Sequence, residues 1–318
     1  MKFVRWDEGD LPVEALCELW NEELAVHFPI SKRLFVQNSL ECQHLFSEGS
    51  WYVVDEGQAI GFITTKYTKE NENLLPAGIG WVQALLIQKE YRNNGIGSQL
   101  LKKAERALSD RGVDKIIIGR DIHHYFPGVP STDPNISFWF EKRQYSKVNK
   151  VKDFYRIAPS QAEEIKTTDI CMSPISKDEE VQFLTFMEES FPGRWEYEAR
   201  EYFTRGGDGS HFIAARYGHE IIGFVRLNDL NSPVIGPNIY WNGLFEGKLG
   251  GIGPLGIKKE YRKKGYGAAI VQTAINKAIQ RGCRHLVIDW TELDQFYKSF
   301  GFNPWMEYLQ YEKYVKKE

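Results

Sequence analysis

One stretch of the chain reads Ile87-Gln-Lys-Glu-Tyr-Arg-Asn-Asn-Gly-Ile-Gly97, and a second reads Ile257-Lys-Lys-Glu-Tyr-Arg-Lys-Lys-Gly-Tyr-Gly267. The two stretches lie 170 residues apart and are identical at seven of their eleven positions. Gly112 and Gly282, which each follow a helical pattern, repeat at the same distance. In a chain of 318 residues, a repeat of this period predicts two copies of one domain in tandem.

The same order of elements surrounds each copy. Two runs rich in β-branched and aromatic residues form a predicted hairpin, and a third run leads into the glycine-containing stretch. An amphipathic helix and a short apolar strand follow. The expected strands are 51–54, 60–65, 81–87 and 115–118 in the first half and 212–215, 221–227, 249–257 and 285–288 in the second. These patterns predict an α/β fold with a mixed sheet (α+β) in each of two domains, 1–156 and 168–318, joined by a polar linker at 157–167.

The composition argues against several classes of protein. Forty Lys and Arg against 43 Asp and Glu give a net charge of −3, so we expect no nucleic-acid partner. No run of 18 apolar residues occurs, so we expect no membrane span, and the N-terminus does not resemble a signal peptide. The four cysteines form no CxxC pair, which favours free thiols in a reducing cytoplasm and no metal site.

The repeated Arg-x-x-Gly-x-Gly segment, placed between a strand and a helix, is suited to anion binding. Glycine lets the backbone approach a ligand, and the free amides of the first helical turn favour a phosphate. The arginine adds charge-assisted hydrogen bonds. A tight turn is the alternative for a single copy, but two copies in the same setting favour a phosphate site.

The order of these elements, followed by Phe296-Tyr-Lys-Ser-Phe-Gly-Phe302, resembles the GNAT superfamily of acetyl-CoA-dependent N-acetyltransferases. The resemblance covers both halves, so the chain looks like a tandem GNAT protein. It implies acetyl-CoA as the cofactor, with the pyrophosphate on the glycine loop and the pantetheine arm beside the preceding strand. The implied positions are Leu255, Gly256, Ile257, Arg262, Lys263, Lys264, Gly265, Tyr266, Gly267 and Ala268 in the second half, and Leu85, Ile87, Arg92, Asn94, Gly95, Gly97 and Ser98 in the first.

The resemblance also indicates which half is catalytic. GNAT enzymes commonly use a tyrosine as general acid toward the thiolate of coenzyme A, and Tyr297 matches that position. Phe140 stands there in the first half and has no proton to give. We therefore expect the second half to carry the chemistry and the first half to be catalytically degenerate. The alternative for Tyr297 is an ordinary half-buried aromatic residue with a satisfied hydroxyl.

The acceptor amine must be neutral before it attacks, so a base is required. Asp289 ends the last strand of the second half and is the candidate, with a helix cap or a turn residue as the alternative. Trp290 stands where many members of the family have asparagine. Trp290 and Glu246 are the candidate acceptor-binding residues, because aromatic faces and carboxylates suit an amino sugar.

The predicted reaction is direct transfer of an acetyl group from acetyl-CoA to the primary amine of a small molecule. The segments 288–291 and 303–305 are similar to those of amino-sugar acetyltransferases, which favours an acceptor such as glucosamine. Acetylation of a peptide or protein amine and a non-catalytic acyl-CoA sensor are the alternatives. Because the duplication supplies a dimer-like pair of domains within one chain, we expect a monomer or a weak homodimer.

Overall fold

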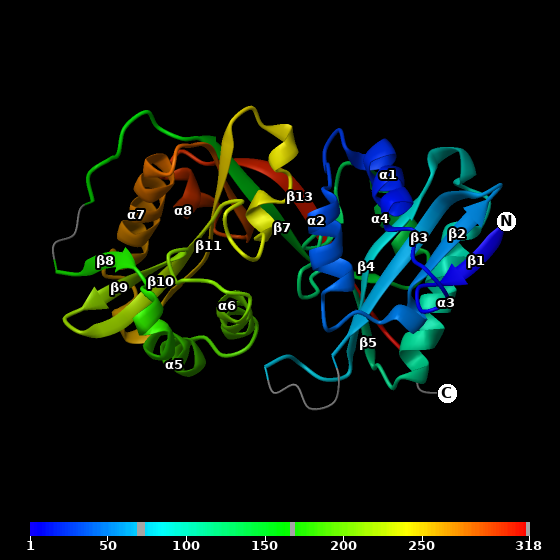
Figure 1. Ribbon diagram of the computed structural model, residues 1–318, viewed down its shortest axis with the longest axis horizontal. Helices are drawn as coiled ribbons and strands as arrows, with labels where there is room; N and C mark the ends of the chain where they lie inside the picture. The colour runs from blue at the N-terminus through cyan, green and yellow to red at the C-terminus, as the bar shows by residue number, and fades with distance from the viewer. Residues whose placement is uncertain (69–73, 166–168, 316–318) are drawn as a thin grey trace. The chain divides into compact units, whose positions relative to one another are not determined.

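The computed structural model describes residues 1–68, 74–165 and 169–315, which form two compact units (Figure 1). Unit 1 consists of the described residues of Met1–Val151 together with 306–315, and unit 2 of those in Lys152–Trp305. Parts of the expected linker and second domain, residues 166–168 and 316–318, lie outside the described residues.

Unit 1 contains a mixed sheet in the strand order β1-β2-β3-β4-β5-β13, in which only β4 and β5 are parallel neighbours. Its strands are β1 Lys2–Arg5, β2 Trp51–Asp55, β3 Gln58–Tyr67, β4 Ile79–Ile87, β5 Lys115–Ile118 and the short β6 Val129–Pro130, with most of β13 Asn303–Tyr314. Its helices are α1 Val13–Leu24, α2 Lys32–Phe35, α3 Ile96–Asp110 and α4 Pro134–Glu141.

Unit 2 repeats this arrangement in the order β7-β12-β11-β10-β9-β8, with β11 and β12 as its parallel pair. Its strands are β8 Cys171–Pro174, β9 Phe212–Tyr217, β10 Glu220–Asn228, β11 Lys248–Ile257 and β12 Cys283–Thr291, with the second half of β7 Ser146–Ile157. Its helices are α5 Glu180–Ser190, α6 Arg194–Thr204, α7 Tyr266–Gln280 and α8 Asp294–Lys298. The mixed α/β fold and its duplication, both expected from the sequence, are confirmed.

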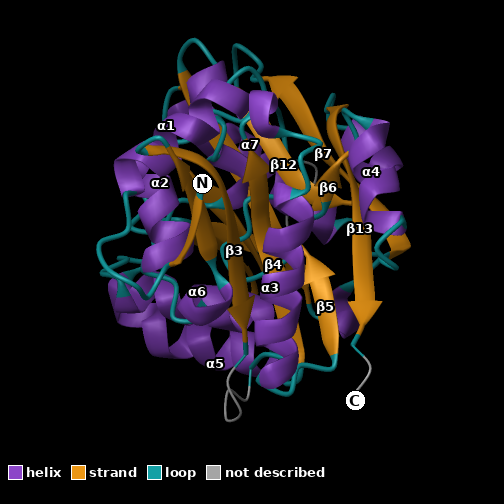
Figure 2. Ribbon diagram, turned by 90° about the vertical axis from the view of Figure 1, so that its right-hand side faces the viewer, coloured by secondary structure: helices purple, strands orange, loops and turns teal. Residues whose placement is uncertain are grey.

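Each unit is completed by a strand from the other half of the sequence. In unit 1, β13 pairs antiparallel with β5, so that Tyr311 lies opposite Ile118; their arrows point in opposite directions in Figure 2. In unit 2, β7 pairs with β12, and Tyr155 lies opposite Val287. The units therefore differ from the expected domains, because 152–156 belong to unit 2 and 306–315 to unit 1. Both exchanged strands cover a sheet edge whose backbone groups would otherwise lack partners.

Apolar side chains on both faces of the unit 2 sheet build its core. One face packs on α7, which buries Ile270, Ala274 and Ile275, and the other packs on α5 and α6 (Figure 1). The second face is aromatic, with Phe183 of α5 against Phe224 of β10. Burial from two sides holds β10 and β11 rigid, so residues at the ends of these strands are well positioned.

The exchanged strand predicts a specific stability effect for Tyr311. Its side chain is fully buried in unit 1 and its hydroxyl donates to Glu141 at 2.9 Å. We expect Tyr311→Ala to lower the free energy of unfolding by about 3 kcal/mol, as loss of a large buried ring does. Hydrogen exchange of the same variant is expected to show lost protection at the amides of β5.

Tyr314→Ala is the matched control, because Tyr314 lies on the same strand but is 71% exposed. Its effect is expected to stay within about 0.5 kcal/mol. If Tyr311→Ala instead exposed the amides of β12 and left those of β5 protected, the strand exchange would be contradicted.

Candidate active site

The parallel strands β11 and β12 stop pairing before they end. Their last paired residues are Gly251 and Val287, although β11 continues to Ile257 and β12 to Thr291. Residues 255–257 pair with β10 on their other side. The edge of β11 toward β12 is thus uncovered by any strand of the described residues. Such an edge can accept an extended ligand arm through backbone hydrogen bonds.

The glycine loop joins the end of β11 to α7. Gly265 caps the helix in a left-handed conformation, with φ of +86°, and no side chain caps the first turn of α7 within the described chain. Arg262 donates through Nε to the carbonyl of Ile257 at 2.9 Å and ties the loop to the strand. The first-turn amides, together with the helix dipole, make this end of α7 suitable for a phosphate.

The other expected cofactor positions in unit 2 lie around the same loop. Leu255 and Gly256 lie on the uncovered part of β11, and Lys263 and Lys264 are exposed. Tyr266 differs, because its side chain is buried and its hydroxyl donates to Asp169 at 2.5 Å. Only the backbone of Tyr266 is therefore available to a ligand.

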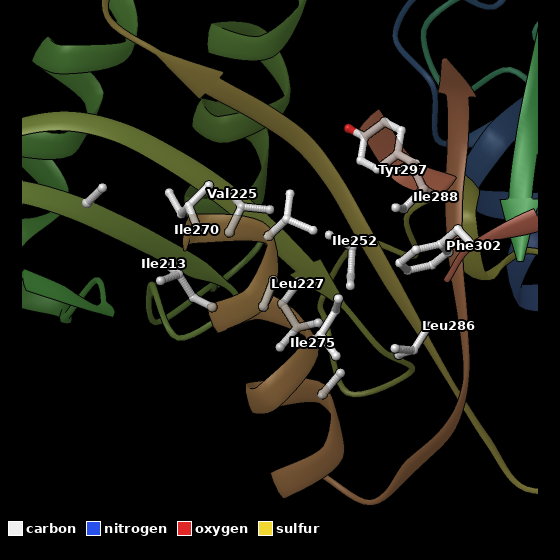
Figure 3. Close-up of a cluster of buried hydrophobic side chains, with 14 of the residues drawn as sticks. Ile213, Val225, Leu227, Ile252, Ile270, Ile275, Leu286, Ile288, Tyr297 and Phe302 are labelled. Carbon is white, nitrogen blue, oxygen red and sulfur yellow. The ribbon is translucent and has the colours of Figure 1, made fainter. Parts of the chain in front are cut away.

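Tyr297 lies on α8, near the diverging ends of the two strands. The side chain is 7% exposed and packs between Phe154 and Phe302, at ring distances of 6.3 and 6.4 Å. Figure 3 shows its hydroxyl pointing away from Ile288 and Phe302. Burial, with the nearby charge of Asp289, raises the pKa of Tyr297 to about 12, so the hydroxyl keeps its proton at neutral pH.

Asp289 precedes a distortion of β12. The pairing with β7 shifts between Ile288 and Thr291, and Trp290 adopts a φ of +42° while its N–H donates to Asp153 at 2.9 Å. Burial raises the pKa of Asp289 to about 6, and the charge of Glu198 adds to this rise. Its charge acts in turn on the pKa of Tyr297, so the two side chains lie within range of an electrostatic interaction.

The first turns of α6 bring further charges to Asp289. The Arg194 guanidinium lies 4.9 Å from the centre of the Trp290 ring, and its Nε donates to Glu198 at 2.8 Å. The charges of Arg194 and Glu198 both act on the pKa of Asp289. Because α6 begins about 95 residues before Asp289, the sequence pattern gave no sign that Glu198 belongs to this group.

Glu246 does not join these residues. It is exposed, and its backbone carbonyl accepts a hydrogen bond from His285 Nε2 at 2.9 Å. His285 lies in the paired part of β12, near the start of the strand. Glu246 therefore lies beside the start of β12, whereas Asp289 lies near its end, and we withdraw Glu246 as an acceptor-binding candidate.

Unit 1 has the same backbone with different side chains. Its strand β4 also continues beyond the paired part, because pairing with β5 ends at Val82 and Ile118, the last residue of β5, and Gly95 caps α3 with a φ of +80°. The residues 170 positions before Asp289 and Trp290 are Gly119 and Arg120, and Arg120 shares the left-handed conformation, with φ of +61°. Unit 1 therefore has no carboxylate at the position of Asp289.

The glycine loop of unit 1 also differs in its charge. Arg92 repeats the bond from Nε, here to Ile87 at 2.9 Å, but its Nη2 pairs with Glu23 of α1. The same carboxylate accepts the N–H of Lys89 at 2.8 Å. Within the described chain, no carboxylate forms an ion pair with Arg262 of unit 2.

The other expected cofactor positions of unit 1 lie on the same β4–α3 connection. Leu85 pairs with β3, and Asn94 donates to the carbonyl of Tyr91 at 3.4 Å. A Cβ at Gly97 would lie 3.6 Å from Trp139 of α4, and the Ser98 hydroxyl accepts from Arg143. Side chains of α4 and of the turn after it therefore lie against the beginning of α3.

Comparison with known protein families identifies the family of this chain. Residues 13–125 and 180–302 each match the model of the Acetyltransferase (GNAT) family. The chain belongs to the GNAT acetyltransferase family. One match lies in each half of the chain, so it is a tandem GNAT protein.

Solved structures agree with this fold. A glucosamine N-acetyltransferase region of a fungal multi-domain β-N-acetylglucosaminidase is 22% identical, with a TM-score of 0.86 over 98% of this chain and 38% of that one. A tandem GNAT protein of the clavulanic acid pathway is 14% identical, with a TM-score of 0.71 over 100% and 99%. A GNAT protein from Sphaerobacter thermophilus is 15% identical, with a TM-score of 0.68 over 99% and 96%. No curated protein matches the sequence. Among the described residues, no helix has the length and apolarity to cross a membrane.

The raised pKa of Asp289 predicts a pH-dependent effect on stability. In the unfolded chain an aspartate has a pKa of about 3.9. The stability that the protonated Asp289 contributes below that pH is therefore lost as the pH rises through the folded pKa of about 6. Asparagine has no charge to bury. We therefore expect Asp289→Asn to raise the free energy of unfolding by about 2 kcal/mol at pH 8 and to change it little at pH 4.

Urea unfolding at both pH values measures this difference, and Asp208→Asn provides a control of opposite sign. Hydrogen bonds from Ser210 lower the pKa of Asp208 to about 2, so its replacement is expected to cost stability at pH 8. An equal effect of Asp289→Asn at pH 4 and pH 8 would contradict a raised pKa.

Proposed function

We propose that unit 2 transfers an acetyl group directly from acetyl-CoA to the primary amine of a small molecule. The observation that carries this proposal is that Tyr297, a buried hydroxyl that keeps its proton, lies within electrostatic range of Asp289, a carboxylate of raised pKa. Both lie where β11 and β12 diverge. A proton donor and a proton acceptor at one place are what the two proton transfers of this reaction require.

The cofactor would occupy the glycine loop and the uncovered edge of β11. Its pyrophosphate would accept hydrogen bonds from the amides of Gly265, Gly267 and Ala268 at the beginning of α7. The exposed Lys263 and Lys264 add positive charge beside the loop. The pantetheine arm would lie along Leu255–Ile257, which points the thioester toward Tyr297 and Asp289.

The reaction then needs two proton transfers. Asp289 accepts a proton from the acceptor ammonium, and the neutral amine attacks the thioester carbonyl. When the carbon–sulfur bond breaks, Tyr297 donates its proton to the departing thiolate. A pKa of about 6 makes Asp289 a stronger base than an ordinary aspartate, while leaving it largely ionised at neutral pH.

An amino sugar is the acceptor class that the surrounding residues support best. Trp290 is partly exposed and would add an aromatic surface beside Arg194, and the carboxylate of Asp289 would attract an ammonium. The similar fungal structure is described as a glucosamine N-acetyltransferase region, which supports the same class.

Unit 1 is proposed to have no catalytic role. Gly119 and Phe140 stand where unit 2 has Asp289 and Tyr297, and Glu23 neutralises the arginine of its glycine loop. This combination favours a structural role or weak acyl-CoA binding for unit 1.

Removal of one hydroxyl tests the proposed acid. We expect Tyr297→Phe to lower kcat by about 100-fold or more, because a positioned proton donor contributes about that factor. The measurement is acetyl transfer to a panel of amines that includes glucosamine. Tyr217→Phe, at a 49% exposed surface position, is the control and is expected to match wild type. An unchanged kcat in Tyr297→Phe would exclude the hydroxyl as the acid.

A matched pair of glycine substitutions tests which loop holds the cofactor. A Cβ at Gly95 or Gly265 meets no atom within 4 Å, so a side chain fits either loop. In calorimetric titrations with acetyl-CoA, Gly265→Asp is expected to abolish binding because its carboxylate repels the pyrophosphate. Gly265→Asn imposes the same backbone strain without the charge and is expected to retain part of the affinity. Gly95→Asp is expected to bind as wild type, and loss of binding in that variant would move the site to unit 1.

A further inference from the structure

Two buried asparagines connect Asp289 to the interior of unit 2. Asn238, in a short helical turn Pro237–Ile239, is 2% exposed, and Asn228, the last residue of β10, is fully buried. Asn238 Nδ2 donates to Asp289 Oδ1 at 2.9 Å, and Asn228 Nδ2 donates to Asn238 Oδ1 at the same distance. Both Nδ2 atoms also contact the carbonyl oxygen of Gly253, at 3.4 and 3.1 Å.

These bonds fix which way each amide faces. The Gly253 carbonyl can only accept, so both Nδ2 groups must face it. The two hydrogens of Asn228 Nδ2 are then used by Gly253 and by Asn238 Oδ1. With Oδ1 thus engaged, Asn238 presents Nδ2 to Asp289. A flipped Asn238 would place its oxygen against the carboxylate and lose three of the four bonds.

The packing around Asn238 leaves it no other position. A Cβ at Gly251 would lie 1.9 Å from Asn238 Oδ1, so only glycine fits on β11 beneath the amide. At Gly253, a Cβ would meet Asn238 Nδ2 at 3.7 Å and Asp289 Oδ1 at 3.8 Å. Gly251 therefore makes the space that the amide occupies, while the contacts at Gly253 show how closely β11 passes both side chains.

We propose that Asn238 is a positioning residue that holds one oxygen of Asp289 and favours its ionised form, leaving the other oxygen to face the acceptor amine. The inference rests on the proposed function of Asp289 as base. A donor-only contact stabilises the carboxylate over the carboxylic acid. Asn238 thus opposes the effect of burial, which raises the pKa of Asp289.

Asn238 shares this effect with a backbone hydrogen bond at Asp289, which also lowers the pKa of the carboxyl group. Glu198 raises the pKa of Asp289 and Arg194 lowers it, and these two residues of α6 also pair with each other. Tyr297 of α8 stays protonated. Asp153 of β7 is engaged with the N–H of Trp290.

The test compares Asn238→Ala and Asn238→Asp with wild type in two measurements. In the first, ¹³C NMR titration of aspartate carboxyls follows Asp289, whose signal is assigned by its loss in Asp289→Asn. Asn238→Ala is expected to raise the pKa of Asp289 by about one unit, and Asn238→Asp by more, since it replaces a donor with a second carboxylate. An unchanged pKa in both variants would overturn the proposal.

The second measurement is the pH dependence of kcat/KM for acetyl transfer. Its acidic limb is expected to move up with the pKa of Asp289 in Asn238→Ala, with the KM for acetyl-CoA unchanged. Asn242→Ala is the control, because Asn242 bonds only to the carbonyls of Ile239 and Tyr240 in the same loop. Equal shifts in Asn242→Ala would overturn the proposal by assigning the effect to the loop.

The two measurements separate this inference from the proposed function. If the NMR pKa rises while the pH profile stays fixed, Asn238 positions Asp289 but Asp289 is not the base. If no amine is acetylated by wild type, the titration still decides the role of Asn238.

Discussion

The candidate site depends on one constraint, the early end of pairing between the parallel strands β11 and β12. Beyond Gly251 and Val287 the two strands separate, and their backbone groups need other partners. Gly253 finds them in two asparagine side chains, and Trp290 finds Asp153. The uncovered edge of β11, the orientation of Asp289 and the position proposed for the thioester all follow from this separation.

Local chemistry explains what the sequence could predict. A position with a left-handed backbone conformation before a helix favours glycine, so Gly95 and Gly265 indicated both loops. The structure gives these two glycines nearly equal φ angles. Helices α3 and α7 and the hairpins before them were likewise visible in their apolar periodicity. The choice of partner strand is not local. Nothing in the residues of β13 distinguishes β5 as its neighbour, so the strand exchange was missed.

The candidate site was predictable only where it follows such local patterns. Asp289 directly follows the strand expected at 285–288, and Tyr297 lies in the segment after it, so both stand at recognisable places. Asn238 lies in an irregular stretch about 50 residues before Asp289, and no periodicity connects them. The sequence places Glu246 in a loop but does not show which end of β12 that loop reaches. In the structure the loop contacts the start of β12, away from Asp289.

The strand exchange has a consequence for the order in which the chain acquires its structure during synthesis. All strands of the unit 2 sheet, from β7 to β12, end before residue 306, so this sheet has every member before residues 306–315 leave the ribosome. Unit 1, whose first strand is made at the start, waits for β13 to cover β5. Until then β5 presents an open edge, and a nascent chain with an open strand edge is prone to misassembly. The half that is translated first therefore finishes folding last.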